Sequence, residues 1–506
     1  MAAPAASSKR GTGPSESNRT IAGNDYNLRV LEHSLPIPAD DLEAWLQELP
    51  PCAAVFALFG PEASEGGLAA EPYISKTANL RRRMHRLLAP SSGSGRRLHL
   101  GGRVVRLAYS QVGSEFATSL LLLQAVRQYC GERVRKHLHL RSPVLLRMAT
   151  ENPYPRVYVT NRVTQRALAS TYGPFPSRAA AERFLDDSLN FFELRRCTEQ
   201  LHPDPTFPGC VYSEMKMCLA PCFQGCSDER YAEEAEQVRV YLDSRGARTI
   251  AQLEKERNDA SAALDFEKAE RLHQRVQKMK TVAQQAPPLV HPLAELDAIV
   301  VQPAVMQKAQ QDSAGSTQAA KPEKLSNRAM RSDADHVEIF LVRGGRILGP
   351  GFFSVEGMRH PNERAGSTSL FPHPTLLQPT PLEATPASND PACNAGNPDV
   401  PAATKGARGA LEQRLQAVLD ELEARARAEK FPADQLGEHL ALLTRWYYRP
   451  ANRRIGEIFF REEKSGLDSG SAEAETPSFP LSRVLRGISR VFCGQKEAVE
   501  TGERTT

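Results

Sequence analysis

Long apolar runs are missing from this 506-residue sequence. The longest run of strongly apolar residues is Leu120–Leu123, whereas a membrane-spanning helix needs about 20 such residues. Residues 1–20 also lack the apolar stretch of a secretory signal. Without export, cysteines are expected to stay reduced. We therefore expect a cytoplasmic protein that contacts no membrane.

Net charge is also small, at +4, so overall basicity gives no argument for nucleic acid. Acidic residues, however, are absent from Pro72 to Ser114. An uncompensated basic stretch of this length predicts salt-dependent binding to a phosphate backbone. The alternative is a solvated basic face whose charges pair with acids elsewhere in the fold. The basic residues of this stretch are Lys76, Arg81, Arg82, Arg83, Arg86, Arg96, Arg97, Arg103 and Arg106.

Cysteines are few but concentrated, since five of the nine lie between Cys197 and Cys226. Thiolates this close together favour a soft metal ion or an iron–sulfur cluster. Cys218 and Cys222 lie within about one helical turn, and Cys197 and Cys210 could complete the ligand set from the preceding loop. Cys226 would then be a spare or alternative ligand. The alternative is a group of buried free thiols, or disulfides in an exported protein.

Hydrophobic patterning predicts an α/β (α+β) multidomain chain. The order strand, strand, helix, strand, helix near the N-terminus is typical of a small α/β domain. The predicted segments are a disordered tail (1–45), this small domain (46–148), a cysteine-cluster domain (149–232), a helical hairpin (240–285), a further α/β segment (286–460) with disordered inserts (306–335 and 360–408), and a C-terminal tail (461–506).

Residues 249–280 contain no glycine or proline and carry one apolar stripe between charged faces. Periodicity alone predicts either an antiparallel hairpin or one long helix, which packs on a partner or on its own chain. The stripe consists of Ile250, Leu253, Ala260, Leu264, Leu272, Val276 and Met279.

Several stretches together resemble one family, the UvrC subunit of the bacterial UvrABC nucleotide-excision repair nuclease. The segments AVF and YISKTANLRRR stand where its GIY-YIG nuclease domain has GIY and YVGKAKNLRRR. Further on, NPYPRVYVTNR, YGPFPS and FFELRRC resemble its next segment, the four cysteines follow its cluster spacing, and LDFEKAERLHQRV is similar to its UVR motif. These stretches are residues 54–56, 73–83, 152–162, 172–177, 191–197, 197–222 and 264–276.

The resemblance implies a domain that cuts phosphodiesters with one Mg²⁺ or Mn²⁺ ion. By position, Tyr73, Lys76 and Arg83 would be catalytic. A phenol near a metal can take part in proton transfer, and a guanidinium can brace two phosphate oxygens. DNA binding would involve Asn79, Arg81, Arg82 and Arg86.

The resemblance also implies a metal centre and a protein partner. Cys197, Cys210, Cys218 and Cys222 would hold a four-iron four-sulfur cluster or zinc. The UVR-like helices would meet a UvrB-like protein through Leu264, Phe266, Glu267 and Ala269.

Three departures from the family bear on cleavage. Phe56 replaces the tyrosine of the first motif, and Ser75 replaces the glycine of the second. The helical glutamate that holds the metal is replaced by Leu122 or Leu123, which cannot bind a metal. The nearest acid, Glu115, lies about 10 Å along the helix. We expect DNA binding with weakened or lost cleavage.

The family's second nuclease, an RNase H-like domain, begins with a DISH-like strand that this sequence lacks. Residues 295–357 and 440–460 resemble only the segment before that active site. Three functions therefore compete: a UvrC-like repair protein with weak or no cleavage, an active single-cutting endonuclease using Glu115 or another acid, and a DNA-binding regulator controlled by the redox state of its cluster.

Overall fold

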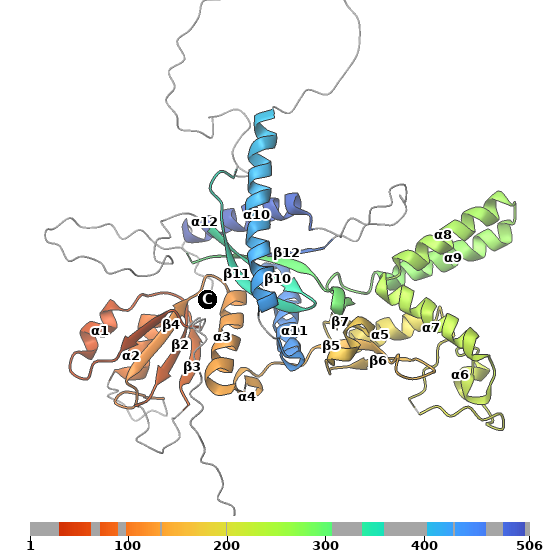
Figure 1. Cartoon of the computed structure of the whole chain (residues 1–506), viewed down its shortest axis with the longest axis horizontal. Coiled ribbons are helices and arrows are strands. Elements are labelled where there is room, and N and C mark those ends of the chain that lie inside the picture. The colour runs from red at the N-terminus through yellow and green to blue at the C-terminus, as the bar shows by residue number, and fades with distance from the viewer. Residues whose placement is uncertain are drawn as a thin grey trace, which may run out of the picture.

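The computed structural model describes residues 30–61, 71–89, 98–131, 134–198, 200–305, 336–358, 402–428, 431–461 and 479–500. Most of the predicted N-terminal tail, the insert predicted at 306–335 and most of the one at 360–408 lie outside these residues. So do Arg96 and Arg97 of the basic stretch. The chain is mixed α and β with three antiparallel four-stranded sheets among the described residues (Figure 1), which confirms the predicted fold class.

The first sheet has the strand order β1-β4-β2-β3. Strand alternation separates two layers, because Phe56 and Leu58 pack against α1 and α2 while Val55 and Ala57 pack against α3. The elements are β1 (His33–Pro36), α1 (Leu42–Glu48), β2 (Ala54–Phe59), β3 (Tyr73–Thr77), α2 (Leu80–Leu88), β4 (Arg106–Gln111), α3 (Glu115–Cys130) and α4 (Val134–Leu138).

Two predicted boundaries of this first domain are wrong. The strand β1 falls inside the predicted disordered tail 1–45, yet it pairs with β4 along its whole length. Its four residues alternate too briefly to be seen as a strand without their partner. At the other end, Val144–Met148 was assigned to the first domain but pairs with strands of the second sheet.

The second sheet has the order β6-β5-β7-β8 and is covered by helices that lead to and from the cysteines. Ser227 caps α7 by accepting a hydrogen bond from the Arg230 backbone N–H. The elements are β5 (Val144–Met148), β6 (Val157–Thr160), the 3₁₀ turn η2 (Gln165–Ser170), β7 (Thr171–Phe175), α5 (Arg178–Leu189), α6 (Val211–Glu214), η3 (Pro221–Phe223), α7 (Asp228–Asp243) and β8 (His291–Pro292).

A helical hairpin follows, formed by α8 (Ala247–Ala262) and α9 (Phe266–Ala283), and projects from the second domain (Figure 1). Val276 and Met279 near its base are fully buried against α5 and α7. Lys280 on α9 bridges to Glu254 on α8 at 2.7 Å. Of the two alternatives left by periodicity, the hairpin is the correct one. Leu264 does not belong to the buried stripe, because it lies in the turn with a φ of 60°.

The third sheet has the order β11-β10-β9-β12. A tight turn at Gly344–Gly345 joins β10 to β11. The elements are η4 (Leu293–Glu295), β9 (Ala298–Pro303), β10 (His336–Arg343), β11 (Arg346–Ser354), α10 (Ala402–Ala428), α11 (Ala433–Tyr447), η5 (Ala451–Arg453), β12 (Glu457–Phe460) and α12 (Leu481–Glu500).

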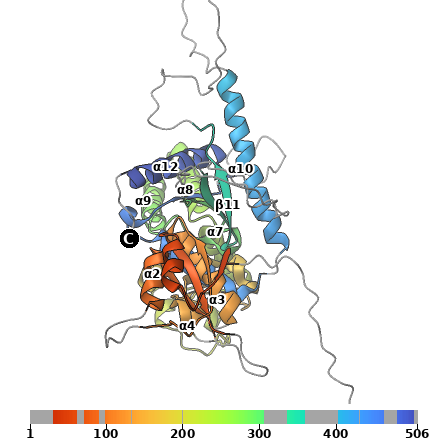
Figure 2. The ribbon, with the colours of Figure 1, turned by 90° about the vertical axis from the view of Figure 1, so that its left-hand side faces the viewer.

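Two predictions about this C-terminal part are wrong. Helix α12 lies inside the predicted C-terminal tail, and its Val484, Ile488 and Phe492 are buried on the third sheet. Helix α10 begins at Ala402, inside the insert predicted to be disordered to residue 408, and projects beyond the sheet (Figure 2). Both helices become stable through packing on a sheet distant in sequence.

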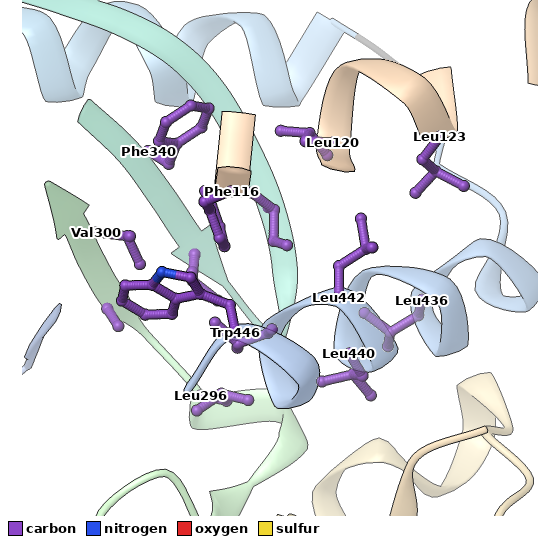
Figure 3. Packing of buried hydrophobic residues seen from close by; sticks show 14 of the residues in the cluster. Phe116, Leu120, Leu123, Leu296, Val300, Phe340, Leu436, Leu440, Leu442 and Trp446 are labelled. Carbon is purple, nitrogen blue, oxygen red and sulfur yellow. The ribbon is translucent and has the colours of Figure 1, made fainter. Parts of the chain in front are cut away.

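Helix α3 is shared between the first and third sheets. One face packs on the first sheet through Ala125, and another carries Phe116 into the largest core, under the third sheet and α11. The ring of Phe116 lies edge-on to Phe340 at 5.0 Å and to Trp446 at 5.2 Å between centroids (Figure 3). The first domain is thereby packed onto the C-terminal part. No described helix is long and apolar enough to cross a bilayer.

Candidate functional site

The residues predicted to form a nuclease site gather around β3 and α2. Arg83 on α2 donates a hydrogen bond from Nη2 to the Tyr73 hydroxyl oxygen at 3.0 Å. The Nε of Arg83 is buried and has no hydrogen-bond partner among the described residues. Tyr73 also packs obliquely on Phe56, with ring centroids 6.1 Å apart. A buried N–H without a partner is costly, so this arginine is held in place by its contact with Tyr73 at the expense of one unmade hydrogen bond.

Lys76 has a different set of neighbours. Its ammonium lies 3.7 Å from the carboxylate of Glu115 at the start of α3. The same carboxylate accepts two hydrogen bonds from the guanidinium of Arg449, one of them at 2.6 Å. These hydrogen bonds, helped by the positive charges of Arg449, Lys76 and Arg445, lower the pKa of Glu115 despite its partial burial. Glu115 is therefore an ionised member of an ion-pair network.

The two groups lie on opposite faces of the first sheet. Tyr73 packs with the core beneath α1 and α2, and Ile74, its neighbour on β3, packs towards α3. Lys76 follows the alternation of Ile74 and reaches Glu115 on α3. The structure thus brings Tyr73 to Arg83 and Lys76 to Glu115, and it separates the first pair from the second.

The leucines at the position expected to carry the metal-binding glutamate are surrounded by other apolar side chains. Leu123 is buried in the largest core together with residues of α11 (Figure 3). Leu122 is half-buried between that core and the first sheet. Both side chains are used for packing, so no carboxylate is offered at the middle of α3.

The four residues predicted to bind DNA differ in their availability. Asn79 caps α2 by accepting from the Arg82 backbone N–H at 2.9 Å. Arg81 donates from Nε to the Leu49 carbonyl oxygen at 2.6 Å. Arg82 and Arg86 are exposed on α2. Asn79 and Arg81 thus have structural roles that position the helix, and Arg82 and Arg86 present their charge to solvent.

The four cysteines predicted to bind a metal all lie in the second domain, close enough for their thiols to influence one another. Burial raises the pKa of the Cys218 thiol to about 11, and the nearby Cys197, Cys210 and Cys222 thiols add to the rise. The Ala220 backbone N–H donates to Cys218 Sγ at 3.3 Å. All four cysteines are free, and thiols of this kind suit zinc or an iron–sulfur cluster.

Cys226, the fifth cysteine of the stretch, lies at the margin of this group. Its pKa is raised mainly by burial and then by Asp228, and Cys222 contributes last. Cys197 and Cys210 do not contribute. The fifth thiol thus faces helix α7 more than the other sulfurs.

Arg195 is a residue that sequence reasoning did not single out. It is buried and donates from Nε to the Tyr154 carbonyl oxygen at 2.9 Å and from Nη1 towards Cys197 Sγ at 3.7 Å. Its position two residues before Cys197 was the only available signal, and a buried arginine cannot be told from an exposed one in sequence.

The four residues predicted to meet a partner lie at the tip of the hairpin. Leu264 is 73% exposed and Phe266 is 65% exposed, which is unusual for such large apolar side chains. Glu267 is exposed beside them and Ala269 is half-buried on the next turn. Asp265 caps α9 by accepting from the Lys268 backbone N–H at 3.1 Å. The tip is therefore a rigid turn that presents apolar surface to solvent.

Comparison with known proteins identifies two parts of the chain. Residues 144–241 match the family described as the UvrC/Cho excinuclease middle domain, and residues 247–282 match the UvrB/UvrC motif. The first match spans the second sheet and the cysteines, and the second spans the hairpin. No solved structure matches the chain.

Curated relatives are similar to up to about half of the chain. The UvrABC system protein C of Aliivibrio salmonicida is 26% identical over 259 residues, which cover 49% of this chain and 40% of that protein. Its counterpart in Cereibacter sphaeroides is 30% identical over 240 residues, covering 45% and 36%. That of Nitratidesulfovibrio vulgaris is 35% identical over 144 residues, covering 28% and 21%. The matches thus cover at most about two fifths of these relatives.

Proposed function

Because residues 144–241 and 247–282 make this chain a member of the UvrC family, we propose that it acts in nucleotide-excision repair. In this proposal the chain binds DNA and a UvrB-type partner, and its GIY-YIG-like domain has lost normal cleavage. The loss of cleavage rests on one observation. The acid nearest to the expected metal position, Glu115, is held by Arg449 and Lys76.

A metal ion at Glu115 would have to displace both cations. Arg449 binds the carboxylate with two hydrogen bonds, which is the strongest geometry for this pair. Tyr73 lies on the other face of the sheet, so a metal at Glu115 would not meet the phenol that the family's chemistry needs. Leucines fill the middle of α3, where a carboxylate would be required.

DNA binding is supported by α2. Its exposed Arg82 and Arg86 have no acidic neighbour in the surrounding sequence. A protein that neutralises several phosphates in this way binds duplexes in a salt-dependent manner.

A nicking assay tests the proposal. Anaerobically purified chain is incubated with a lesion-bearing duplex and Mg²⁺ or Mn²⁺, with and without UvrA and UvrB, and DNA binding is measured in parallel. We expect binding without nicking. Nicking that disappears in the Tyr73→Phe, Arg83→Gln and Glu115→Gln variants would establish the competing function, an active endonuclease. Tyr212→Phe in the second domain is the matched control.

The cysteine cluster has a structural role in this proposal. A four-iron four-sulfur cluster, or zinc, would be held by Cys197, Cys210, Cys218 and Cys222. It would link the loop after α5, which carries Cys197, to α6 and η3. A bound group of this kind contributes its binding free energy to folding of the surrounding loops.

Partner binding is assigned to the hairpin tip. Replacing Leu264 and Phe266 by alanine removes apolar surface without touching the buried contacts of Val276 and Met279. We expect the double variant to lose affinity for a UvrB-type protein by about tenfold or more, because exposed aromatic anchors dominate such interfaces. The measurement is a titration by calorimetry. Met215→Ala, at an equally exposed apolar residue elsewhere, is the control. Equal affinity of the tip variant and the parent would reject this assignment.

A further inference from the structure

The end of α3 opposite to Glu115 carries a second group of metal-type ligands. Cys130, the last residue of α3, lies beside His137 on α4 and Glu71 just before β3. Their ligand atoms, one from each residue, all lie within 4.8 Å of one another. His137 Nε2 is 3.9 Å from the Glu71 carboxylate. Three separate segments of the first domain converge on this point.

The antiparallel course of β3 and α3 explains the convergence. Lys76 near the end of β3 meets Glu115 at the start of α3, so the residues before β3 must lie near the end of α3. A 16-residue helix spans roughly 24 Å. The group is therefore distinct from the nuclease-like site, and it is also distinct from the cysteine cluster of the second domain.

We propose that Glu71, Cys130 and His137 form a site for a divalent ion of the zinc class. A thiolate, an imidazole and a carboxylate are the three ligand types that zinc accepts together, whereas Mg²⁺ and Ca²⁺ prefer oxygen ligands alone. In a filled tetrahedral site the ligand atoms lie about 3.3–3.8 Å apart. The present separations therefore need to shorten by only about 1 Å.

The burial pattern suits such a movement. Cys130 is 8% exposed and fixed by the packing of α3, and it is not in a disulfide. The side chains of Glu71 and His137 are each 39% exposed, so they can rotate towards the sulfur. Three protein ligands leave the fourth position for water. The ion would clamp the start of β3 to the ends of α3 and α4.

Zinc content of the whole chain tests the site. Metal-free protein is loaded with Zn²⁺, passed through a desalting column and analysed for zinc per chain by mass spectrometry. We expect His137→Gln and Glu71→Gln to hold one zinc fewer than the parent. The cysteine cluster is intact in every variant, so its contribution cancels. The zinc-dependent rise in melting temperature of the first domain should also be lost.

His85 provides a matched control, because its Nε2 lies 3.9 Å from Glu43 with no cysteine in the group. His85→Gln should keep the zinc content of the parent. Loading with Co²⁺ reports the sulfur directly, since the thiolate-to-metal absorption should be weaker than that of the parent in Cys130→Ser and unchanged in Cys52→Ser, above a constant contribution from the cysteine cluster. If Cys130→Ser does not fold, the two exposed variants decide. Equal zinc content in parent, His137→Gln and Glu71→Gln would overturn the proposal.

Discussion

The residues that carry the resemblance to the UvrC family have different surroundings in the first and second domains. In the first domain, Asn79 and Arg81 hold α2 in place, and Lys76 and Glu115 form an ion-pair network with Arg449. In the second domain, the thiols of Cys197, Cys210 and Cys222 all raise the pKa of Cys218, and the hairpin presents its apolar tip to solvent. The residues of the first domain serve its own architecture, and we propose that those of the second serve a metal and a partner.

The difference follows from what each region packs against. Helix α3 of the first domain is covered by the third sheet and α11, and Arg449 follows α11 directly. The hairpin packs on the second domain away from its tip, through residues that include Leu253, Val276 and Met279. Contact with the C-terminal part is thus what converts Glu115 from a possible ligand into an ion-pair partner.

The largest expected effect is on metal content and stability of the second domain, and it should differ between two cysteine variants. Cys218→Ser should remove the bound metal or cluster and destabilise the second domain by several kcal/mol, because binding free energy at such a site is folding free energy. Cys226→Ser should change neither the bound metal nor the stability. Burial and Asp228 are the main causes of the raised pKa of Cys226, and Cys222 is the one thiol of the four that adds to it. Iron, sulfide and zinc analysis with thermal unfolding measures both variants. Equal loss in the two would mean that Cys226 is a ligand.

Phe116 of α3, with Phe340 and Trp446, forms the joint between the first domain and the C-terminal part. Replacing Phe116 tests this joint. Phe116→Ala should lower the free energy of unfolding by about 3–5 kcal/mol, since it empties the space between Phe340 and Trp446. The chain has two tryptophans, so Trp446 fluorescence in a Trp45→Phe background reports urea unfolding of the joint. Val105→Ala, at an exposed apolar residue, should shift the midpoint little. An unchanged midpoint for Phe116→Ala would show that the two parts are not coupled.

A buried acid on β10, Glu338, makes the free energy of unfolding depend on pH. Burial, with the negative charge of Glu32, raises the pKa of Glu338 from 4.5 to about 8. Glu338 faces Gln302 on the next strand, and Glu338 Oε2 and both polar side-chain atoms of Gln302 have no hydrogen-bond partner among the described residues.

The folded chain holds the Glu338 proton more tightly than the unfolded chain does. Its contribution to stability is therefore complete below pH 4.5 and falls as the pH rises towards about 8. The slope is at most about 1.4 kcal/mol per pH unit. Glu338→Gln should remove this slope, which thermal unfolding between pH 5 and pH 8 would measure. A parent and variant with parallel pH profiles would contradict the assignment.

Local sequence signals predicted much of the fold. Ser227 is a typical cap residue before a helix, and the paired glycines 344 and 345 are a typical signal for a hairpin turn. The order of strands and helices from 54 to 130 was also correct. Each of these features depends on neighbours within a few residues, so it can be recognised in sequence.

The wrong predictions share one cause. The strand β1 is stable only through its pairing with β4, about seventy residues away. Helix α12 was taken for a tail because its apolar face has no partner nearby in sequence, and that partner is the third sheet. Short or amphipathic segments gain stability from packing, which a local pattern does not reveal.

The sequence by itself determined the family-like motifs, the spacing of the cysteines and the absence of a carboxylate at Leu122 and Leu123, because these are properties of residue identity. Only the tertiary structure decided which charges meet. Glu115 and Arg449 are 334 positions apart, and Glu71, Cys130 and His137 come from three segments. Side-chain partners at such separations are set by the packing of α3 between two sheets, and no local pattern carries that information.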